Sequence, residues 1–201
     1  MVLASVLLAG AGAVVLALSV FGARYPTIHP GEQRVFRAIN GLPGWLYWVL
    51  WLPMQLGNLV VGCAVGVAVA VWRGDVGIAV AVVIATLVKL VVERLVRREM
   101  AAYLTVRQRP GTSQPSAILR GKDVPKSGMS FPSGHVILVS AISALLALSL
   151  QGELVWIPWV LTALVMLGRV YVGAHNPLDV AAGLGAGMLI GAGLLFVVAW
   201  L

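Results

Sequence analysis

Three long stretches of this chain carry no charged residue, and they restrict its possible folds more than any other feature. They cover residues 1–23, 38–72 and 180–201. Each can supply the roughly 20 apolar residues that a helix needs to cross a lipid bilayer. Charged side chains make up 10% of the chain, against about 25% in soluble proteins. The sequence therefore predicts an integral membrane protein.

The apolar segments together predict six spans. We expect them at about 2–22, 45–72, from 76 onward, 132–150, 154–172 and 177–200. Pro53 should bend the second span, because proline lacks the N–H and its ring clashes with the preceding turn. Residues 32–40 are predicted to form a short interfacial helix. The expected fold is a single all-α domain over residues 1–201, an integral membrane bundle of six transmembrane helices.

The charged residues are placed unevenly. The chain has 14 Lys and Arg against 7 Asp and Glu, a net charge of +7, and only Arg73 falls clearly outside the connections on one side of the six-span layout. The positive-inside rule would make this basic side cytoplasmic. A site built to hold phosphate would concentrate arginines there too, so the side stays open. A basic face against a bilayer suits anionic lipid headgroups rather than nucleic acid.

The segment Pro132-Ser133-Gly134-His135 lies at the start of the fourth predicted span. Proline is favoured at the first position of a helix. The amides of Ser133 and Gly134 would be unpaired donors at the positive end of the helix dipole, where phosphate binds readily. Gly134 would let an anion approach closely, and His135 can exchange protons. A plain helix cap beside a histidine at the membrane edge explains the same residues equally well.

A second polar cluster joins the fifth and sixth spans. Asn176 and Pro177 mark a helix start. Asp179 in its first turn can accept a hydrogen bond from one imidazole nitrogen of His175, which leaves the other nitrogen unprotonated as a nucleophile or base. The planar guanidinium of Arg169 suits phosphate oxygens. An interfacial ion pair is the alternative, although ionisable groups at membrane depth are functional candidates by default.

The third cluster, Arg107-Gln108-Arg109-Pro110, follows the third span, and by itself it indicates only a basic helix exit at the lipid surface. The combination of clusters is more specific. Pro-Ser-Gly-His at 132–135, Arg-x5-His-x3-Asp at 169–179 and Arg-Pro at 109–110 resemble the type 2 phosphatidic acid phosphatase (PAP2) family. Vanadium haloperoxidases share its pocket. The motif-bearing core covers about residues 76–201.

This resemblance implies a lipid phosphatase that works through a phosphohistidine intermediate. His175 would attack phosphorus, and Asp179 would fix the tautomer and stabilise the developing charge. His135 would protonate the leaving group and then take a proton from the attacking water. The implied phosphate-binding groups are Arg109, Arg169, Ser133 and the amide of Gly134.

Two positions depart from the family pattern. The first family motif is Lys, six residues, then Arg-Pro, and the lysine position is occupied by Ala102. Lys89 is not an obvious substitute, because twenty residues of helix would place it about 30 Å away. The family usually has Ser before the third-motif arginine, where this chain has Gly168. The candidate replacements for the lysine are Arg98, Arg107, Lys122 and Lys126.

We expect no metal and no other cofactor. The chain has one cysteine, Cys63, and three histidines, so Cys/His metal sites are disfavoured, and the motifs offer no carboxylate pair for two metals. The expected partner is a lipid phosphate in a membrane of the bacterial inner, or plasma, membrane type. Polyprenyl phosphate or diphosphate, phosphatidic acid, phosphatidylglycerol phosphate and a phosphorylated polyprenyl sugar all fit. The alternative is a catalytically silent membrane scaffold that binds lipid phosphate; a haloperoxidase fits the apolar spans less well.

The last span has a stripe of small residues, Gly183, Gly187 and Gly191, at four-residue spacing. Such a stripe allows close contact between helices. It would serve an oligomer or packing within the bundle, and we favour the bundle because every helix there needs neighbours.

Overall fold

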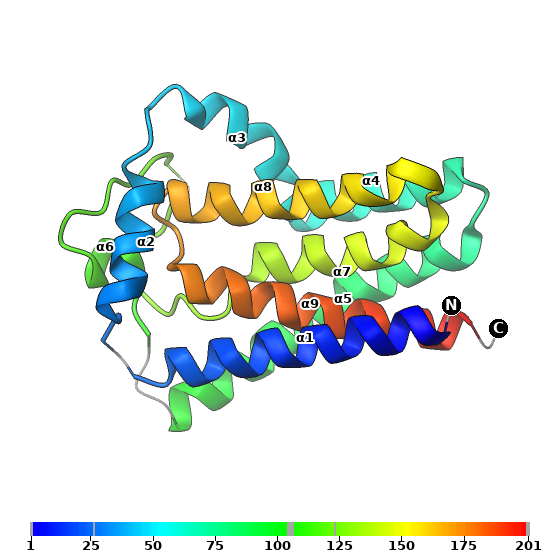
Figure 1. The fold of residues 1–201 in the computed structure, drawn as a ribbon, viewed down its shortest axis with the longest axis horizontal. Coiled ribbons are helices and arrows are strands. Elements are labelled where there is room, and N and C mark those ends of the chain that lie inside the picture. Colours follow the sequence, from blue (N-terminus) through cyan, green and yellow to red (C-terminus); the bar gives the residue numbers. More distant parts are fainter. Residues whose placement is uncertain (1, 26, 104–106, 123, 200–201) are drawn as a thin grey trace.

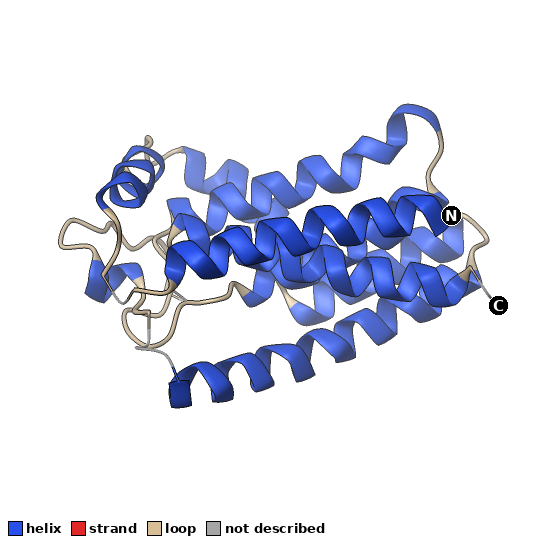
Figure 2. Ribbon diagram, turned by 60° about the horizontal axis from the view of Figure 1, so that its bottom comes forward, coloured by secondary structure: helices blue, strands red, loops and turns tan. Residues whose placement is uncertain are grey.

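Every regular element that the structure describes is a helix (Figure 2). The computed structural model describes residues 2–25, 27–103, 107–122 and 124–199, except for the side chains of residues 97 and 100–103. The elements are α1 (Val2–Ala23), α2 (Pro30–Asn40), α3 (Leu46–Met54), η1 (Gln55–Gly57), α4 (Leu59–Trp72), α5 (Val76–Tyr103), α6 (Pro110–Ser113), α7 (Gly134–Ser149), η2 (Gly152–Trp156), α8 (Ile157–Tyr171) and α9 (Pro177–Val198). The predicted all-α class is confirmed.

Four helical segments in the described residues are long and apolar enough to cross a membrane: Val2–Ala23, Val76–Val96, Gly152–Tyr171 and Pro177–Val198. The pair α3–η1 and α4 adds a fifth if it counts as one broken span. Helix α7, with 16 residues, is shorter. The predicted number of six spans is therefore not confirmed, although an apolar helix lies at each expected place.

The outside of the bundle is apolar. Leu3 on α1 and Val60 on α4 are more than 70% exposed, as is Trp48 on α3. Large apolar side chains that face outward over several long helices need a nonaqueous surrounding. The surface therefore agrees with an integral membrane protein.

The expected bend in the second span lies one turn beyond Pro53. Pro53 is inside α3, whereas the chain breaks between Gly57 and α4 with an angle of 76°. Asn58 caps α4, because its Oδ1 accepts the N–H of Val60 at 3.0 Å. A Cβ at Gly57 would lie 2.7 Å from the Cβ of His135. The break therefore brings a glycine against one of the predicted catalytic residues.

The glycine stripe of α9 packs inside the bundle. A Cβ at Gly183 would lie 2.7 Å from the carbonyl oxygen of Ser133, and one at Gly187 would overlap the hydroxyl of Ser140. One at Gly191 would overlap the side chain of Ala144. These contacts hold α7 and α9 close together. An oligomer through the same stripe remains a prediction.

The connections from α1 to α3, from α5 to α7 and from α8 to α9 gather at one end of the bundle, opposite the two chain termini, and α2 crosses this end (Figure 1). Helices α7 and α9 begin there, and α8 ends there. The three sequence clusters therefore meet at the same end.

Candidate active site

The two ends of the loop between α5 and α7 pair with each other. The N–H of Arg109 donates to the carbonyl of Gly128 at 3.1 Å, and the N–H of Ser130 donates to the carbonyl of Arg107 at 3.0 Å. This pairing places the Arg-Pro motif beside the residues that precede α7.

A tight turn after α8 joins Arg169 to His175. The carbonyl of Arg169 accepts the N–H groups of Ala174 at 3.1 Å and of His175 at 3.2 Å. Gly173 has φ +77°, a left-handed conformation that side chains disfavour. The five residues between the arginine and the histidine of the motif are therefore those that form this turn.

His175 is held by a backbone carbonyl. Its Nδ1 lies 2.9 Å from the oxygen of Ser130, and a carbonyl can only accept a hydrogen bond, so Nδ1 carries the proton in the neutral ring. Nε2 then has the free lone pair. Asp179 Oδ2 lies 3.8 Å from Nδ1, too far for the predicted hydrogen bond. The carbonyl of Ser130 therefore sets the tautomer of His175, in place of the predicted Asp179.

Asp179 is bound by other groups, although it is buried beside His175. Its Oδ2 accepts the N–H of Asn176 at 2.7 Å, as a first-turn acid does in a capping box. Its Oδ1 accepts Nε of Arg107 at 2.8 Å. Arg107 also pairs with Glu32 of α2, whose Oε1 accepts the N–H of Leu178 at 2.9 Å. A buried Glu32–Arg107–Asp179 chain therefore lies behind the nucleophile candidate.

The pKa values of two of these groups follow from this environment. Burial lowers the pKa of His175 below its usual 6.5, although Asp179 acts in the opposite direction. Burial alone would lower the pKa of Arg107, but the carboxylates of Asp179 and Glu32 raise it. At neutral pH, His175 is therefore neutral and Arg107 charged.

Two of the predicted phosphate-binding residues have a buried side-chain atom that forms no hydrogen bond. Four side-chain atoms of the described residues are buried without a hydrogen-bond partner. Ser133 Oγ and Arg169 Nε belong to predicted phosphate ligands, and the other two are Glu32 Oε2 and Arg107 Nη1. Arg109 is also buried, and its Nη1 donates to the carbonyl of Ala174 at 2.9 Å. The N–H of Ser133 was predicted to be unpaired, but it donates to the carbonyl of Asp179 at 2.9 Å. Ser133 thus offers its hydroxyl in place of its amide.

The second histidine lies among positive charges. The charges of Arg169, Lys89 and Arg109 all reach His135. His135 and Arg169 line a polar pocket of about 260 Å³ with side chains from α3 and the loop before α7. The structure therefore brings the two predicted histidines and both predicted arginines to one site.

The candidate replacements for the missing lysine lie elsewhere. Arg98, Lys122 and Lys126 are exposed, and Arg107 is engaged by two carboxylates. The side chain of Ala102 lies outside the described residues. Lys89 was set aside because of its distance along the helix from Arg109, but its charge reaches His135. Helix α5 passes α7 on its way to the loop, so a residue far along the helix from Arg109 reaches the site.

Several groups at the site carry no signal in the three motifs. Ser130 acts through its backbone and Glu32 is a lone acid in α2, so neither was predicted. Glu93 fills the space beside Gly134, where a Cβ would lie 2.5 Å from its Oε2. Gly134 was predicted to leave this space open to an anion. Lys89 and Glu93 did carry a signal, because charged residues are rare in an apolar span.

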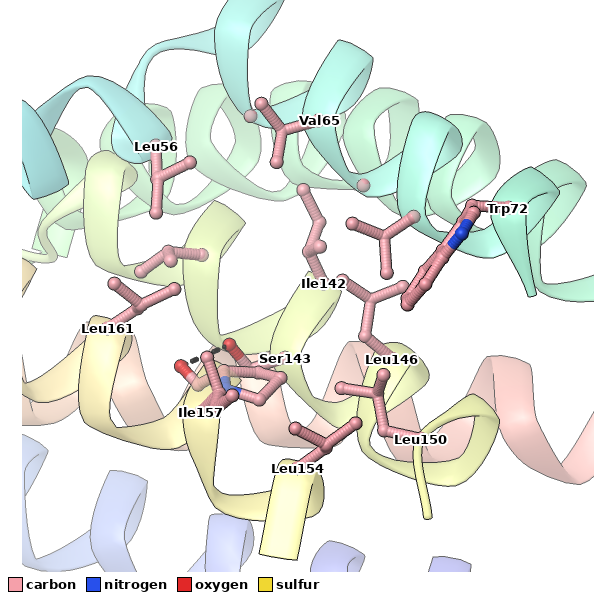
Figure 3. Close-up of a pocket in the computed structure, with 15 residues that line it drawn as sticks. Leu56, Val65, Trp72, Ile142, Ser143, Leu146, Leu150, Leu154, Ile157 and Leu161 are labelled. Carbon is pink, nitrogen blue, oxygen red and sulfur yellow. Dashed lines mark hydrogen bonds between the residues drawn. The ribbon is translucent and has the colours of Figure 1, made fainter.

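Apolar cavities continue from the polar pocket. The polar pocket shares Gln55 with a groove between α3, α4 and α8. That groove shares Leu56 and Val65 with a cavity of about 320 Å³ between α4, α7 and α8 (Figure 3). The hydroxyl of Ser143, which lines this cavity, donates to the carbonyl of Pro158 at 2.9 Å.

Within the described residues, no group of three or more His, Cys, Asp or Glu side chains is placed to hold a metal ion. A reaction without metal remains a prediction.

Comparison with known proteins identifies the class. The sequence model of the PAP2 superfamily matches residues 75–201, and the chain belongs to this superfamily, as the motifs predicted. The undecaprenyl-diphosphatase of Sulfolobus acidocaldarius is 38% identical over 100 residues, which are 49% of this chain and 47% of that protein. The chain thus matches about half the length of this curated relative.

Two solved structures share the fold. Aquifex aeolicus LpxE matches with a TM-score of 0.70 at 22% identity, over 81% of this chain and 93% of that one. The transmembrane PAP2-type phosphatidylglycerolphosphate phosphatase of Bacillus subtilis matches with a TM-score of 0.59 at 20% identity, over 98% and 94%.

Proposed function

We propose that this protein is a membrane lipid phosphatase that hydrolyses a lipid phosphomonoester or diphosphate through a phosphohistidine intermediate. The observation that carries the proposal is the hydrogen bond from His175 Nδ1 to the Ser130 carbonyl, 2.9 Å long. It leaves the Nε2 lone pair of a neutral histidine available beside Arg109 and Arg169.

In the first step, His175 Nε2 attacks phosphorus and the bond from phosphorus to the leaving oxygen breaks. His135 donates a proton to that oxygen; it carries this proton once the negative charge of the bound substrate offsets the nearby cations. In the second step, water attacks the phosphohistidine, His135 takes a proton from the water, and the nitrogen–phosphorus bond breaks. Asp179, 3.8 Å from the ring, stabilises the positive charge that the ring carries as the intermediate.

The phosphoryl oxygens are held by Arg109, Arg169 and the hydroxyl of Ser133. Phosphoryl transfer depends mainly on positioning and charge stabilisation. The buried, unpartnered Ser133 Oγ and Arg169 Nε support this role, because a buried polar group without a hydrogen bond is costly unless a ligand satisfies it.

A lipid substrate is supported by the apolar cavity of Figure 3, which adjoins the polar pocket through the groove at Gln55 and Leu56. A prenyl or acyl chain would lie in this cavity while its phosphate reaches His135. The undecaprenyl-diphosphatase similarity favours a polyprenyl substrate.

The test is phosphate release from farnesyl phosphate and farnesyl diphosphate by purified protein in detergent with EDTA present. We expect wild-type protein to release phosphate and His175→Ala to lose at least about 1000-fold of that rate, since removing a nucleophile leaves only positioning and binding effects. Equal rates for the two proteins would contradict the assignment of His175. Lipid binding without turnover by wild-type protein would favour the scaffold alternative, and a requirement for metal would contradict the cofactor-free mechanism.

A further inference from the structure

Helix α5 carries an ion pair inside its apolar segment. Lys89 Nζ lies 2.5 Å from Glu93 Oε2, with the two side chains only 12% and 18% exposed. Both belong to the membrane-span candidate Val76–Val96. They continue the buried stripe of Ile78, Val82 and Ala85 at helical spacing. Lys89 and Glu93 therefore face the bundle and not the lipid.

The ion pair lies against the start of α7. The carboxylate of Glu93 is so close to Gly134 that a Cβ there would lie 2.5 Å from Oε2. The next residue is His135, and the charge of Lys89 is among those that reach it. Glu93 thus positions the ammonium group of Lys89 next to the predicted acid.

The cations at the site are not equivalent. Arg109 and Arg169 act on both histidines, as expected for groups that hold the phosphoryl group between them. Lys89 acts on His135, whereas the charged groups that act most strongly on His175 are Arg169, Asp179 and Arg109. The contact of Glu93 with Gly134, the residue before His135, places its partner Lys89 on the His135 side of the site, where the leaving group departs.

We propose that Lys89, positioned by Glu93, binds the leaving group and makes this enzyme selective for lipid diphosphates over lipid monophosphates. The proposal rests on the phosphatase function proposed above. From a diphosphate, His175 takes the terminal phosphoryl group, and the electron pair of the broken bond stays on the bridging oxygen of the lipid monophosphate. That product carries additional negative charge, which an ammonium group stabilises.

A monophosphate has no such need for Lys89. Its leaving group is an alkoxide with one charged oxygen, and the proton from His135 neutralises it. The same cation thus contributes more to the diphosphate reaction.

The test compares farnesyl diphosphate with farnesyl monophosphate, which have the same chain. The variants are Lys89→Met, Lys89→Arg and the exposed control Arg94→Met. We expect Lys89→Met to lower kcat/KM for the diphosphate by about 10- to 100-fold more than for the monophosphate, as for loss of one charge-assisted hydrogen bond. Lys89→Arg should retain most of the preference, and Arg94→Met should match wild type.

Lys89→Met leaves the Glu93 carboxylate without its lysine and could impair folding. The double variant Lys89→Met/Glu93→Gln removes both charges, and the ratio of the two kcat/KM values is measured there too. An equal fall for both substrates in the folded variants overturns the role of Lys89 while the phosphatase function stands. If wild-type protein and His175→Ala release phosphate equally, the phosphatase assignment itself fails.

Discussion

The Nδ1 of His175 donates to the carbonyl oxygen of Ser130 over 2.9 Å, while the nearest oxygen of Asp179 is 3.8 Å away. Different residues therefore orient the imidazole ring of His175 and stabilise the positive charge that develops on it. Ser130 holds the ring and its tautomer, and Asp179 places a buried negative charge beside it.

The burial of His175 predicts how catalysis depends on pH. The neutral form of His175 is the active one, and burial lowers its pKa below 6.5. Activity should therefore persist as pH falls through 6.5 and be lost only as pH falls through the lower pKa of the folded protein. The acid limb of kcat/KM, which reports the free enzyme, measures this.

Asp179→Asn should shift the same limb to lower pH. The charge of Asp179 favours the protonated ring, so its removal lowers the pKa of His175 further. The rate at the optimum should also fall, because the imidazolium of the intermediate loses its counter-charge. An acid limb above pH 6.5 in wild type, or an upward shift in Asp179→Asn, would contradict this account.

Arg107 is predicted to stabilise the folded protein. Its buried guanidinium pairs with both Asp179 and Glu32, so Arg107→Met leaves two carboxylates buried without a cation. Such a loss typically costs about 3–5 kcal/mol, which equilibrium unfolding in detergent would measure. The exposed Arg98→Met is the control. The assignment is wrong if both variants unfold like wild type.

The contact of α7 with α9 gives a further prediction. Gly187→Ala introduces a Cβ that overlaps Ser140 Oγ, and overpacking of this kind costs about 1–3 kcal/mol. Separating the helices also moves His135 away from His175, so activity should fall with stability. Gly193→Ala on the same helix, where a Cβ meets nothing within 4 Å, should leave both unchanged. Equal effects of the two substitutions would refute the packing role.

Much of the architecture could be predicted from the sequence, because apolar periodicity and helix starts are local. The apolar helices lie at the expected places, and α9 begins at Pro177 as predicted. Helix α2 begins at Pro30, two residues before the predicted start, and α7 begins at Gly134, after Pro132 and not at it. The number of spans could not be predicted in the same way. It depends on whether a bent pair and a 16-residue helix cross the bilayer.

At the site, residue types could be predicted but their partners could not. The motifs indicated His175 and Asp179, yet a backbone carbonyl such as that of Ser130 has no sequence signature. Lys89 was set aside because the twenty residues between it and Arg109 were treated as one continuous helix, which would place the two side chains far apart. Only the packing of α5 against α7 shows that a residue from the middle of α5 reaches His135.

The central claim is that His175 carries the phosphoryl group. The most direct test treats His135→Ala protein with farnesyl diphosphate labelled at the terminal phosphate, followed by rapid quenching and peptide mapping. His135 serves both steps, but the lipid phosphate that leaves a diphosphate departs more readily without a proton than an alkoxide does. Removal of His135 should therefore slow hydrolysis more than formation and let labelled enzyme accumulate. We predict an acid-labile, base-stable phosphoramidate on the peptide that contains His175, and none in the double variant with His175→Ala. Label on another residue, or turnover by His175→Ala at the wild-type rate, would contradict the account.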